Sequence, residues 1–313
     1  MIARYAVRRI AAAIPVLIGA ALVAFLLMRL VPGDPALALL GSEADPAAIA
    51  TLRHDLALDQ PISVQFLAWI SQVAVGNLGR SIASGRMVAP MLAAALGPTV
   101  LLAASAIGLA VLIGVPAGVY VATHRGLARA MSFLALVGMS MPSFWLGLVL
   151  ILTLAIWLPV FPASGYVPFA EDPLGHLSHL ALPALTLGAA MTSITLRITQ
   201  TAMLQALRAP HVRTALAKGL SVQQAVWRHA FLTARITVLV QLAVQAGKLL
   251  GGVVVIETVF AWPGLGKLAV DAVFARDYPV LQGAVLLIAV TFVILNLIAD
   301  LAQVLLDPRV QTQ

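Results

Sequence analysis

The feature that most constrains this chain is a set of six long apolar stretches. A membrane-spanning helix needs about 20 predominantly apolar residues, and a helix satisfies its backbone groups within the segment. The predicted spans are Ile10–Val31, Pro98–Ala122, Met131–Leu158, Leu180–Met203, Ile236–Ile256 and Val280–Val304. We therefore expect an all-α, polytopic membrane protein with six transmembrane helices.

The composition agrees with a protein that is solvated by lipid. It is 61% hydrophobic and 10% charged, with a mean hydropathy of +1.01, whereas an average soluble domain is about 45–50% apolar and about 25% charged. The absence of cysteine excludes disulfides, thiol catalysis and cysteine-based zinc sites. Arg8 and Arg9 precede the first span, as in a signal peptide, but the span exceeds the roughly 7–15 residues of an h-region, so we expect a retained helix.

The distribution of lysine and arginine predicts the orientation of the chain, because cytoplasmic loops are enriched in basic residues. With the N-terminus inside, 12 of the 19 basic residues lie on the cytoplasmic side or at the adjoining helix ends. They are Arg4, Arg8, Arg9, Arg125, Arg129, Arg197, Arg208, Arg213, Lys218, Arg228, Arg235 and Arg309. Both termini are then predicted to be cytoplasmic.

The segment that follows the first span, residues 32–96, is predicted to be an outer subdomain of a single permease domain that covers 1–313. Asp45 is a suitable helix cap and Pro46 a suitable first helical residue. The apolar residues that share a helical face are Ile49, Leu52 and Leu56, followed by a second amphipathic stretch with Phe66, Leu67, Trp69 and Ile70. This segment either shields the helix bundle or offers a docking surface for a partner.

The second outer loop contains aromatic residues and two histidines. Trp157 and Tyr166 are typical of side chains that anchor a protein at the membrane boundary. His176 and His179 are three residues apart and could form a metal pair. Without a pattern of carboxylate ligands nearby, interfacial polar residues are the better interpretation, and we predict no metal site.

The sequence of the inside loop, residues 204–235, predicts a short helix that a partner protein could bind. Pro210 can begin this helix, and Gly219 can end it in a left-handed cap. Val212, Leu216 and Leu220 are predicted to form its apolar face. Ser221 and Gln224 resemble a capping box that begins the next helix. The alternative is an amphipathic helix that lies on the lipid surface.

Several segments, in order and spacing, resemble the dipeptide/oligopeptide type of ABC importer permease over nearly the whole chain. They are RYAVRRIAAAIPVLIGAALVAFLLMRLVPGDP, LDQPISVQFLAWI, GNLGRSI, SMPSFWLGL, LPALTL, RTALAKGLS, ETVFAWPGLGKL, DYPVLQG and DLAQVLLDPR. The resemblance implies the type I ABC importer permease fold in a bacterial inner membrane. It also implies a second homologous permease, two ATPase subunits that bind ATP and Mg²⁺, and a soluble substrate-binding protein, with no cofactor bound by this chain.

The resemblance further implies a set of residues that couple the permease to its ATPases. The coupling motif corresponds here to Arg213, Thr214, Ala215, Ala217, Lys218 and Gly219. The sequence departs from the motif at Leu216, where relatives often carry arginine, at Thr237, where the motif usually closes with proline, and at Pro210, a commonly acidic position. The family's cargo includes di- and oligopeptides, glutathione-like peptides, nickel chelates and some sugars.

Three catalytic motifs are absent from the sequence, and one competing class of transporter has to be weighed. The phosphate-binding pattern G-x-x-x-x-G-K-[ST] is absent, so ATP hydrolysis is expected on another chain. His-Glu-x-x-His and Gly-x-Ser-x-Gly are also absent. A secondary transporter commonly carries carboxylates within its spans, but Glu257 and Asp300 lie near the ends of predicted spans.

Two groups of residues are candidates for the translocation pathway. Lys248 lies about 18 Å along the fifth span at 1.5 Å per residue, and a lysine at that depth should face protein or water. Gln241 and Gln245 lie on nearly the same face, so the three predict a polar stripe that favours cargo with a carboxylate. A structural ion pair of Lys248 with a partner permease is the alternative. Trp262 and Leu265, in a turn rich in proline and glycine, are predicted to face the axis shared with that permease. The alternative is a loop whose tryptophan only anchors it at the membrane boundary.

Overall fold

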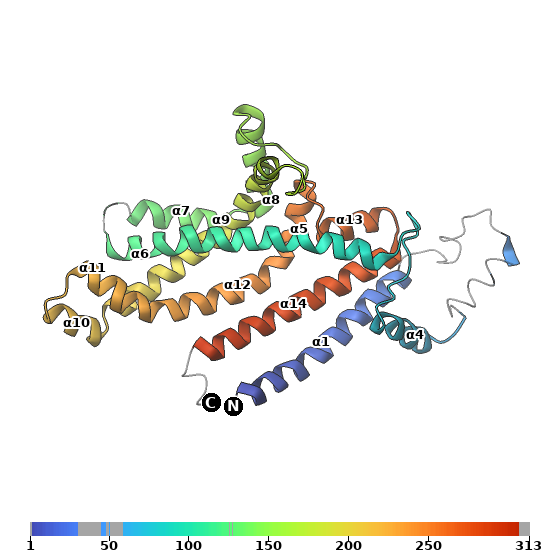
Figure 1. Cartoon of the computed structure of the whole chain (residues 1–313), viewed down its shortest axis with the longest axis horizontal. Helices are drawn as coiled ribbons and strands as arrows, with labels where there is room; N and C mark the ends of the chain where they lie inside the picture. Colours follow the sequence, from blue (N-terminus) through green and yellow to red (C-terminus); the bar gives the residue numbers. More distant parts are fainter. Residues whose placement is uncertain are drawn as a thin grey trace. The chain divides into compact units, whose positions relative to one another are not determined.

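The computed structural model describes residues 2–30, 45–47, 50, 59–124, 126 and 128–306. Within these ranges the only β pairing is one antiparallel bridge between Arg80 and Met87. The elements in Figure 1 are α1 (Ile2–Leu30), α4 (Ile62–Ala74), α5 (Val88–Leu109), η1 (Ala110–Gly114), α6 (Val115–Thr123), α7 (Ala128–Ser140), α8 (Ser143–Leu150), η2 (Ile151–Trp157), α9 (Pro173–Leu207), α10 (Pro210–Ala217), α11 (Val222–Ala225), η3 (Val226–Ala230), α12 (Phe231–Val259), α13 (Leu265–Phe274) and α14 (Tyr278–Leu306). The η elements are π-helical.

In the part of the chain that the structure describes, five helical runs are long and apolar enough to cross a membrane, and a bent helix pair supplies a sixth. The five runs are Val7–Leu26, Val88–Thr123, Pro173–Leu207, Val222–Gly247 and Tyr278–Leu301. The predicted fifth span, Ile236–Ile256, lies within α12. The prediction of an all-α, polytopic protein with six membrane-crossing segments is confirmed.

The predicted third span, Met131–Leu158, is wrong as one continuous helix. It is made of α7 and then α8 with η2, and the run bends by 108° where α7 meets α8. Pro142 lies at the bend in an extended conformation, with φ −60° and ψ 132°. Proline lacks an N–H and disfavours helical geometry in the residue before it, so α7 ends there and α8 begins in a new direction.

The chain divides into two compact units of interleaved segments. The large unit contains Met1–Val7, Pro98–Pro263 and Ile294–Gln313, and the small unit contains Arg8–Gly97 and Gly264–Val293. Because α1, α5 and α14 each contribute to both units, neither unit is a separate stretch of sequence.

Helix α9 is the centre of the large unit, and η1, α6, α7, α8 and α12 pack against it (Figure 1). Glycines make these contacts close. A Cβ atom on Gly114 would lie 2.8 Å from the carbonyl oxygen of Thr192, and one on Gly118 would lie 2.6 Å from that of Leu196. These two glycines have the small-xxx-small spacing that lets membrane helices approach at backbone distance.

The small unit is held by an apolar core and by one buried carboxylate. The core residues are Val88, Leu92, Ala95, Leu265, Ala272, Val280 and Ala284. The carboxylate of Asp277 accepts hydrogen bonds from the Ser81 hydroxyl at 2.5 Å and from the backbone N–H groups of Ile82 at 3.1 Å and Ala83 at 3.4 Å. Asp277 therefore fastens the hairpin of residues 79–87 to the N-terminus of α14.

The predicted amphipathic helix is present as α4, and its aromatic residues pack against α1. The ring of Phe25 lies 5.4 Å from that of Phe66 and 5.8 Å from that of Trp69. The Asp45 cap is also present, because its carboxylate accepts a hydrogen bond from the N–H of Ala47 at 3.1 Å. The predicted face of Ile49, Leu52 and Leu56 lies outside the described residues.

Among the helices that the structure describes, four end in the same hydrogen-bonded turn, the Schellman motif. In α4, α10, α12 and α13 the residue in the left-handed position donates to the carbonyl three residues back, and the next residue donates to the carbonyl five back. Gly76 and Gly219 occupy this position in α4 and α10, but Ala261 and Arg276 occupy it in α12 and α13, with φ of 50° and 54°. A side chain in this conformation costs about 1–2 kcal/mol.

Candidate functional site

The predicted short helix of the inside loop is α10, and its beginning and end follow the predicted signals. Pro210 is its first residue, after Ala209 in an extended conformation. Gly219 has φ of +91°, and its N–H donates to the Leu216 carbonyl at 3.0 Å. No atom lies within 4 Å of the position that a Cβ on Gly219 would take. Backbone torsion, rather than crowding, therefore requires glycine here.

The predicted capping box is also confirmed. The N–H of Gln224 donates to the Ser221 hydroxyl at 3.3 Å, and the N–H of Ser221 donates to the Gln224 side chain at 3.1 Å. Two consecutive end signals, the Gly219 cap and this box, thus separate α10 from the helical run of α11, η3 and α12.

The predicted apolar face of α10 is wrong in part. Val212 is fully buried, but Leu216 is 41% exposed, and Ala215 is buried in its place. The buried residues Val212 and Ala215 are three positions apart on α10. Helix α10 is in contact with η3, and the small side chain of Ala215 allows this close approach. The core formed there contains Val119, Ala202, Met203, Ala206, Val212, Ala225, Val226, Ala230 and Ala234.

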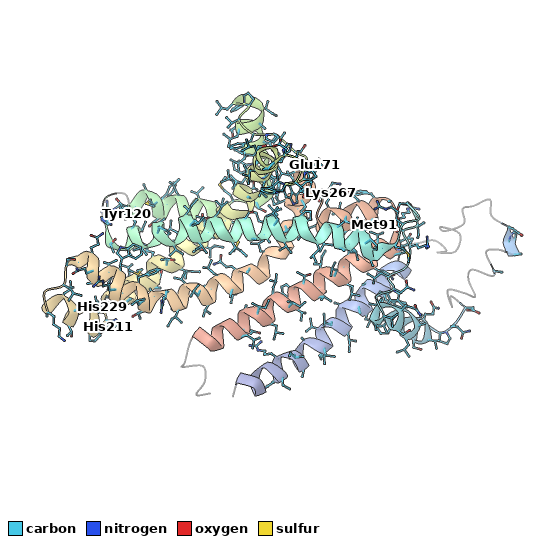
Figure 2. All side chains as sticks on the ribbon, in the orientation of Figure 1. Met91, Tyr120, Glu171, His211, His229 and Lys267 are labelled. Atoms are coloured by element: carbon cyan, nitrogen blue, oxygen red, sulfur yellow. The ribbon has the colours of Figure 1, made fainter. Side chains whose placement is uncertain are left out.

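The opposite face of α10 is solvent-exposed and basic. Of the six predicted coupling residues, Ala215 is buried, and the other five are exposed: Arg213, Thr214, Ala217, Lys218 and Gly219. His211, on the same helix, lies 3.3 Å through Nε2 from the hydroxyl of Thr233 on α12. Figure 2 labels His211 and His229 in the region of α10 and α11. The face can dock a partner, and among the described residues no group of three His, Cys, Asp or Glu side chains could hold a metal ion.

The predicted polar stripe lies on α12, where the structure describes two of its three side chains. Gln241 is exposed. The side-chain oxygen and nitrogen of Gln245 are both buried and have no hydrogen-bond partner in the described part of the chain. Lys248 lies in α12, and its side chain is outside the described part. An unpaired amide is costly in an apolar environment, so Gln245 is a polar group available to a partner or to cargo.

Trp262 and Leu265 do not face an open axis in this chain. Trp262 is fully buried in the core of the large unit, where its indole N–H donates to the Pro98 carbonyl at 2.9 Å. Leu265 is buried in the core of the small unit. The expectation that both side chains line a shared pathway is not supported, because each one fills its own unit's interior.

The two outer-loop histidines bind backbone oxygens. Nδ1 of His176 lies 2.6 Å from the carbonyl oxygen of Val167, and Nδ1 of His179 lies 2.7 Å from that of Gly175. Tyr166 stacks edge-to-face on Trp262, with ring centroids 4.8 Å apart. His176 therefore joins the first turn of α9 to the preceding loop, whereas the His179 bond lies within α9. Tyr166 belongs to a packed cluster rather than acting only as a membrane anchor.

Sequence reasoning missed the close contacts of Gly114 and Gly118 with α9, although the threonines of the fourth span are expected to form hydrogen bonds between helices or to line a polar channel. Thr195 and Thr199 are buried, and neither hydroxyl has a hydrogen-bond partner in the described residues. On the same helix, the buried hydroxyl of Thr186 donates to the Leu182 carbonyl at 2.7 Å. The signal that could have found the contact is the Gly-x-x-x-Gly spacing of Gly114 and Gly118.

Family models cover almost the whole chain. Residues 114–312 match the binding-protein-dependent transport system inner membrane component, and residues 1–113 match the N-terminal model of binding-protein-dependent transport system membrane components. The chain belongs to this family. This permease is 39% identical over 306 residues to a protein from Brucella abortus whose name assigns it to a peptide transport system as a permease. The alignment covers 97% of this chain and 98% of that relative.

Other relatives of this permease carry more specific names. It is 38% identical over 309 residues to a Sinorhizobium fredii protein named as a peptide ABC transporter permease, over 98% of this chain and 99% of the relative. It is also 38% identical over 312 residues to the glutathione transport system permease protein of Salmonella typhi, over 98% of each chain. The chain is therefore a membrane-spanning, channel-forming subunit of an ABC importer, and it is a transport component rather than an enzyme.

Proposed function

We propose that this permease forms half of a translocation channel, with a second homologous permease as the other half. Two separate ATPase subunits bind ATP and Mg²⁺ and dock on the cytoplasmic side, and a soluble binding protein delivers the cargo on the other side. Both termini are cytoplasmic in this proposal, which the excess of basic residues near that side supports. This chain binds no cofactor of its own.

The observation that carries the proposal is the construction of α10. Its exposed basic face is separated from its buried face, which packs on α9, α11 and η3. A force applied to α10 by a moving ATPase therefore reaches the membrane helices through side-chain contacts that are already made. Alternating access then follows from two arrangements of the bundle that the ATPases favour in turn.

The cargo is a peptide or a similar small solute with a carboxylate. The names of the relatives support peptides as the substrate class. Gln241, Gln245 and Lys248 occupy successive turns of α12, and a lysine within a span is best placed toward protein or a water-filled path. In this proposal Lys248 attracts the C-terminal carboxylate, and the unpaired Gln245 amide offers it a hydrogen bond.

Uptake measured in proteoliposomes tests this function against secondary transport. The vesicles contain the complete complex, and labelled dipeptide and glutathione are offered together with the binding protein. We expect uptake to need internal ATP and to continue when ionophores collapse the proton and sodium gradients. Uptake that follows an ion gradient without ATP would contradict the proposal, and an ATPase variant that cannot hydrolyse ATP provides the control.

A further inference from the structure

The C-terminal end of α13 carries an exposed apolar surface that the fold of this chain does not cover. Phe274 is 85% exposed and Val273 is 54% exposed. The two belong to a helix whose other side is buried through Leu265, Gly266 and Ala272. Large aromatic side chains that are this exposed, beside a well-packed helix, are typical of protein interfaces.

Three arginines lie near this end of α13, either in the sequence or through the contact that Asp277 makes. Arg276 follows Phe274 by two residues, and Arg80 and Arg86 lie on the hairpin that Asp277 holds against the same end of α13. All three arginines are exposed. Among the described residues no acidic side chain pairs with them, although Arg80 reaches the Gly85 carbonyl at 3.4 Å. This end of α13 therefore combines exposed apolar side chains with exposed positive charge that no described acidic side chain neutralises.

The backbone at Arg276 adds a separate observation. Arg276 occupies the left-handed position of the Schellman motif that ends α13, with φ of 54°. Glycine is the favoured residue there, and Gly76 and Gly219 fill the equivalent positions of α4 and α10, while Ala261 fills that of α12. The strained backbone at Arg276 is compatible with a functional position, where strain of this kind is concentrated.

We propose that this surface, defined by Arg80, Arg86, Val273, Phe274 and Arg276, is where the soluble substrate-binding protein docks, through an apolar socket rimmed by acidic residues. The inference rests on the proposed function, which places this end of α13 outside the cytoplasm. Charge complementarity selects an acidic partner, and the rim speeds the encounter more than it strengthens the complex. Phe274 fills the socket and supplies most of the affinity.

A membrane surface is the competing occupant, and the charge pattern disfavours it. Asp271 lies three residues before Phe274, so the two share a face of α13, and Asp271 is exposed while its carboxylate pairs with Lys267 at 2.5 Å. Inserting the aromatic side chain into lipid would carry the charged pair of Asp271 and Lys267 toward the apolar region, which is costly. A folded protein accommodates such a mixed surface by placing its own charges to match it.

The test measures the affinity of the binding protein of the same transport system for the complete complex in nanodiscs. Phe274→Ser and Arg276→Asn are the variants, since asparagine tolerates the left-handed conformation and removes only the charge. Each should raise the binding-protein concentration that half-stimulates ATP hydrolysis about tenfold or more. Leu174→Ser is the matched control, because Leu174 is 79% exposed beside Glu171 and Asp172 rather than arginines, and it should change nothing.

Salt and lipid composition separate the possible outcomes. Wild-type affinity should fall as salt rises, and the fall should be shallower when Arg80→Ser and Arg86→Ser are combined. Unchanged affinity in the Phe274 and Arg276 variants would overturn the docking surface while leaving ATP-driven import in place. An effect that follows the anionic lipid content, and not the binding protein, would also overturn it. A wild-type complex whose ATP hydrolysis ignores the binding protein would overturn both this inference and the proposed function.

Discussion

The hydroxyl of Ser81 donates a 2.5 Å hydrogen bond to the carboxylate of Asp277, which lies 196 residues further along the chain. The two residues belong to the segments GNLGRSI and DYPVLQG, which the sequence offers only as separate motifs. The bond explains why each segment contains a small polar residue beside a turn. The attachment of the hairpin of residues 79–87 therefore depends on one buried side chain, that of Asp277.

Replacing this carboxylate should release the hairpin. Asp277→Asn keeps the size of the side chain but removes the charge that strengthens its three hydrogen bonds, at a cost of about 2 kcal/mol. Trypsin, which cuts after arginine, should then cleave at Arg80 and Arg86 about 30-fold faster, because 1.4 kcal/mol corresponds to a factor of ten. Asp271→Asn, which affects only an exposed pair with Lys267, should leave the cleavage rate as it is.

Gly219→Val should uncouple the permease from its ATPases without preventing membrane insertion. A β-branched residue in the left-handed conformation of Gly219 costs about 1–2 kcal/mol or more, and the turn that ends α10 is distorted. Transport and binding-protein-stimulated ATP hydrolysis should both fall, while the amount of membrane-inserted protein stays at the wild-type level. Gly126→Val is the control, since Gly126 is in an exposed turn with no left-handed torsion. Normal transport by the Gly219 variant would remove α10 from the coupling path.

Gly118→Ala should destabilise the large unit. The added Cβ would lie 2.5 Å from the Cβ atom of Thr199 and 2.6 Å from the Leu196 carbonyl oxygen, so α6 must move away from α9. Overpacking of this kind costs about 1–3 kcal/mol, and thermal unfolding in detergent should detect it. Gly108→Ala, with no atom within 4 Å of the new methyl group, should be neutral or slightly stabilising. Equal melting temperatures for both variants would mean that α6 and α9 are not in close contact.

Thr199→Val should stabilise the described arrangement of α9. Valine has nearly the same shape as threonine and removes a buried hydroxyl that has no hydrogen-bond partner in the described residues, a gain of about 1 kcal/mol. Thr186→Val is the matched comparison, because its buried hydroxyl already donates to Leu182 and its loss should not stabilise the protein. The same change in melting temperature for both variants would contradict this distinction.

Lys248→Met separates a pathway role from a structural one. Methionine is also long and unbranched but removes the charge, so uptake of peptides with a free C-terminal carboxylate should fall about tenfold or more, whereas uptake of C-terminally amidated peptides should change little. Assembly of the complex, followed by size-exclusion chromatography, is the second readout. Loss of assembly would mean that Lys248 pairs with the partner permease and does not bind cargo.

The elements with strong local signals could be predicted from the sequence. Pro210, Gly219 and the pair Ser221 and Gln224 act through torsions and hydrogen bonds within a few residues, so α10 and its boundaries follow from local chemistry. The bend at Pro142 was missed because a proline within an apolar run is compatible with both a kinked and a broken helix.

Properties that depend on distant parts of the chain could not be predicted in the same way. Leu216 was expected to be buried, but Ala215 is buried instead. The position of η3, and not the periodicity of α10, decides which side of the helix is covered. Trp262 was assigned to an open axis, since its sequence neighbours give no sign of the Pro98 carbonyl that its indole N–H meets. Such contacts join segments that are far apart in sequence, and apolar composition in a membrane span does not distinguish lipid-facing from protein-facing sides.

Two of the π-helical segments, η1 and η3, continue directly into α-helix and affect how this permease should be aligned with its relatives. A π turn holds one residue more than an α turn, so η1 and η3 each change the register of the helix that follows by about 100°. A relative that lacks one of these turns would align with this chain only through a one-residue gap in the middle of a membrane helix. Such a gap is usually treated as an alignment error, but here it would mark the insertion of the residue that forms the π turn. It would also identify relatives in which the residues after η1 present a different side to α9.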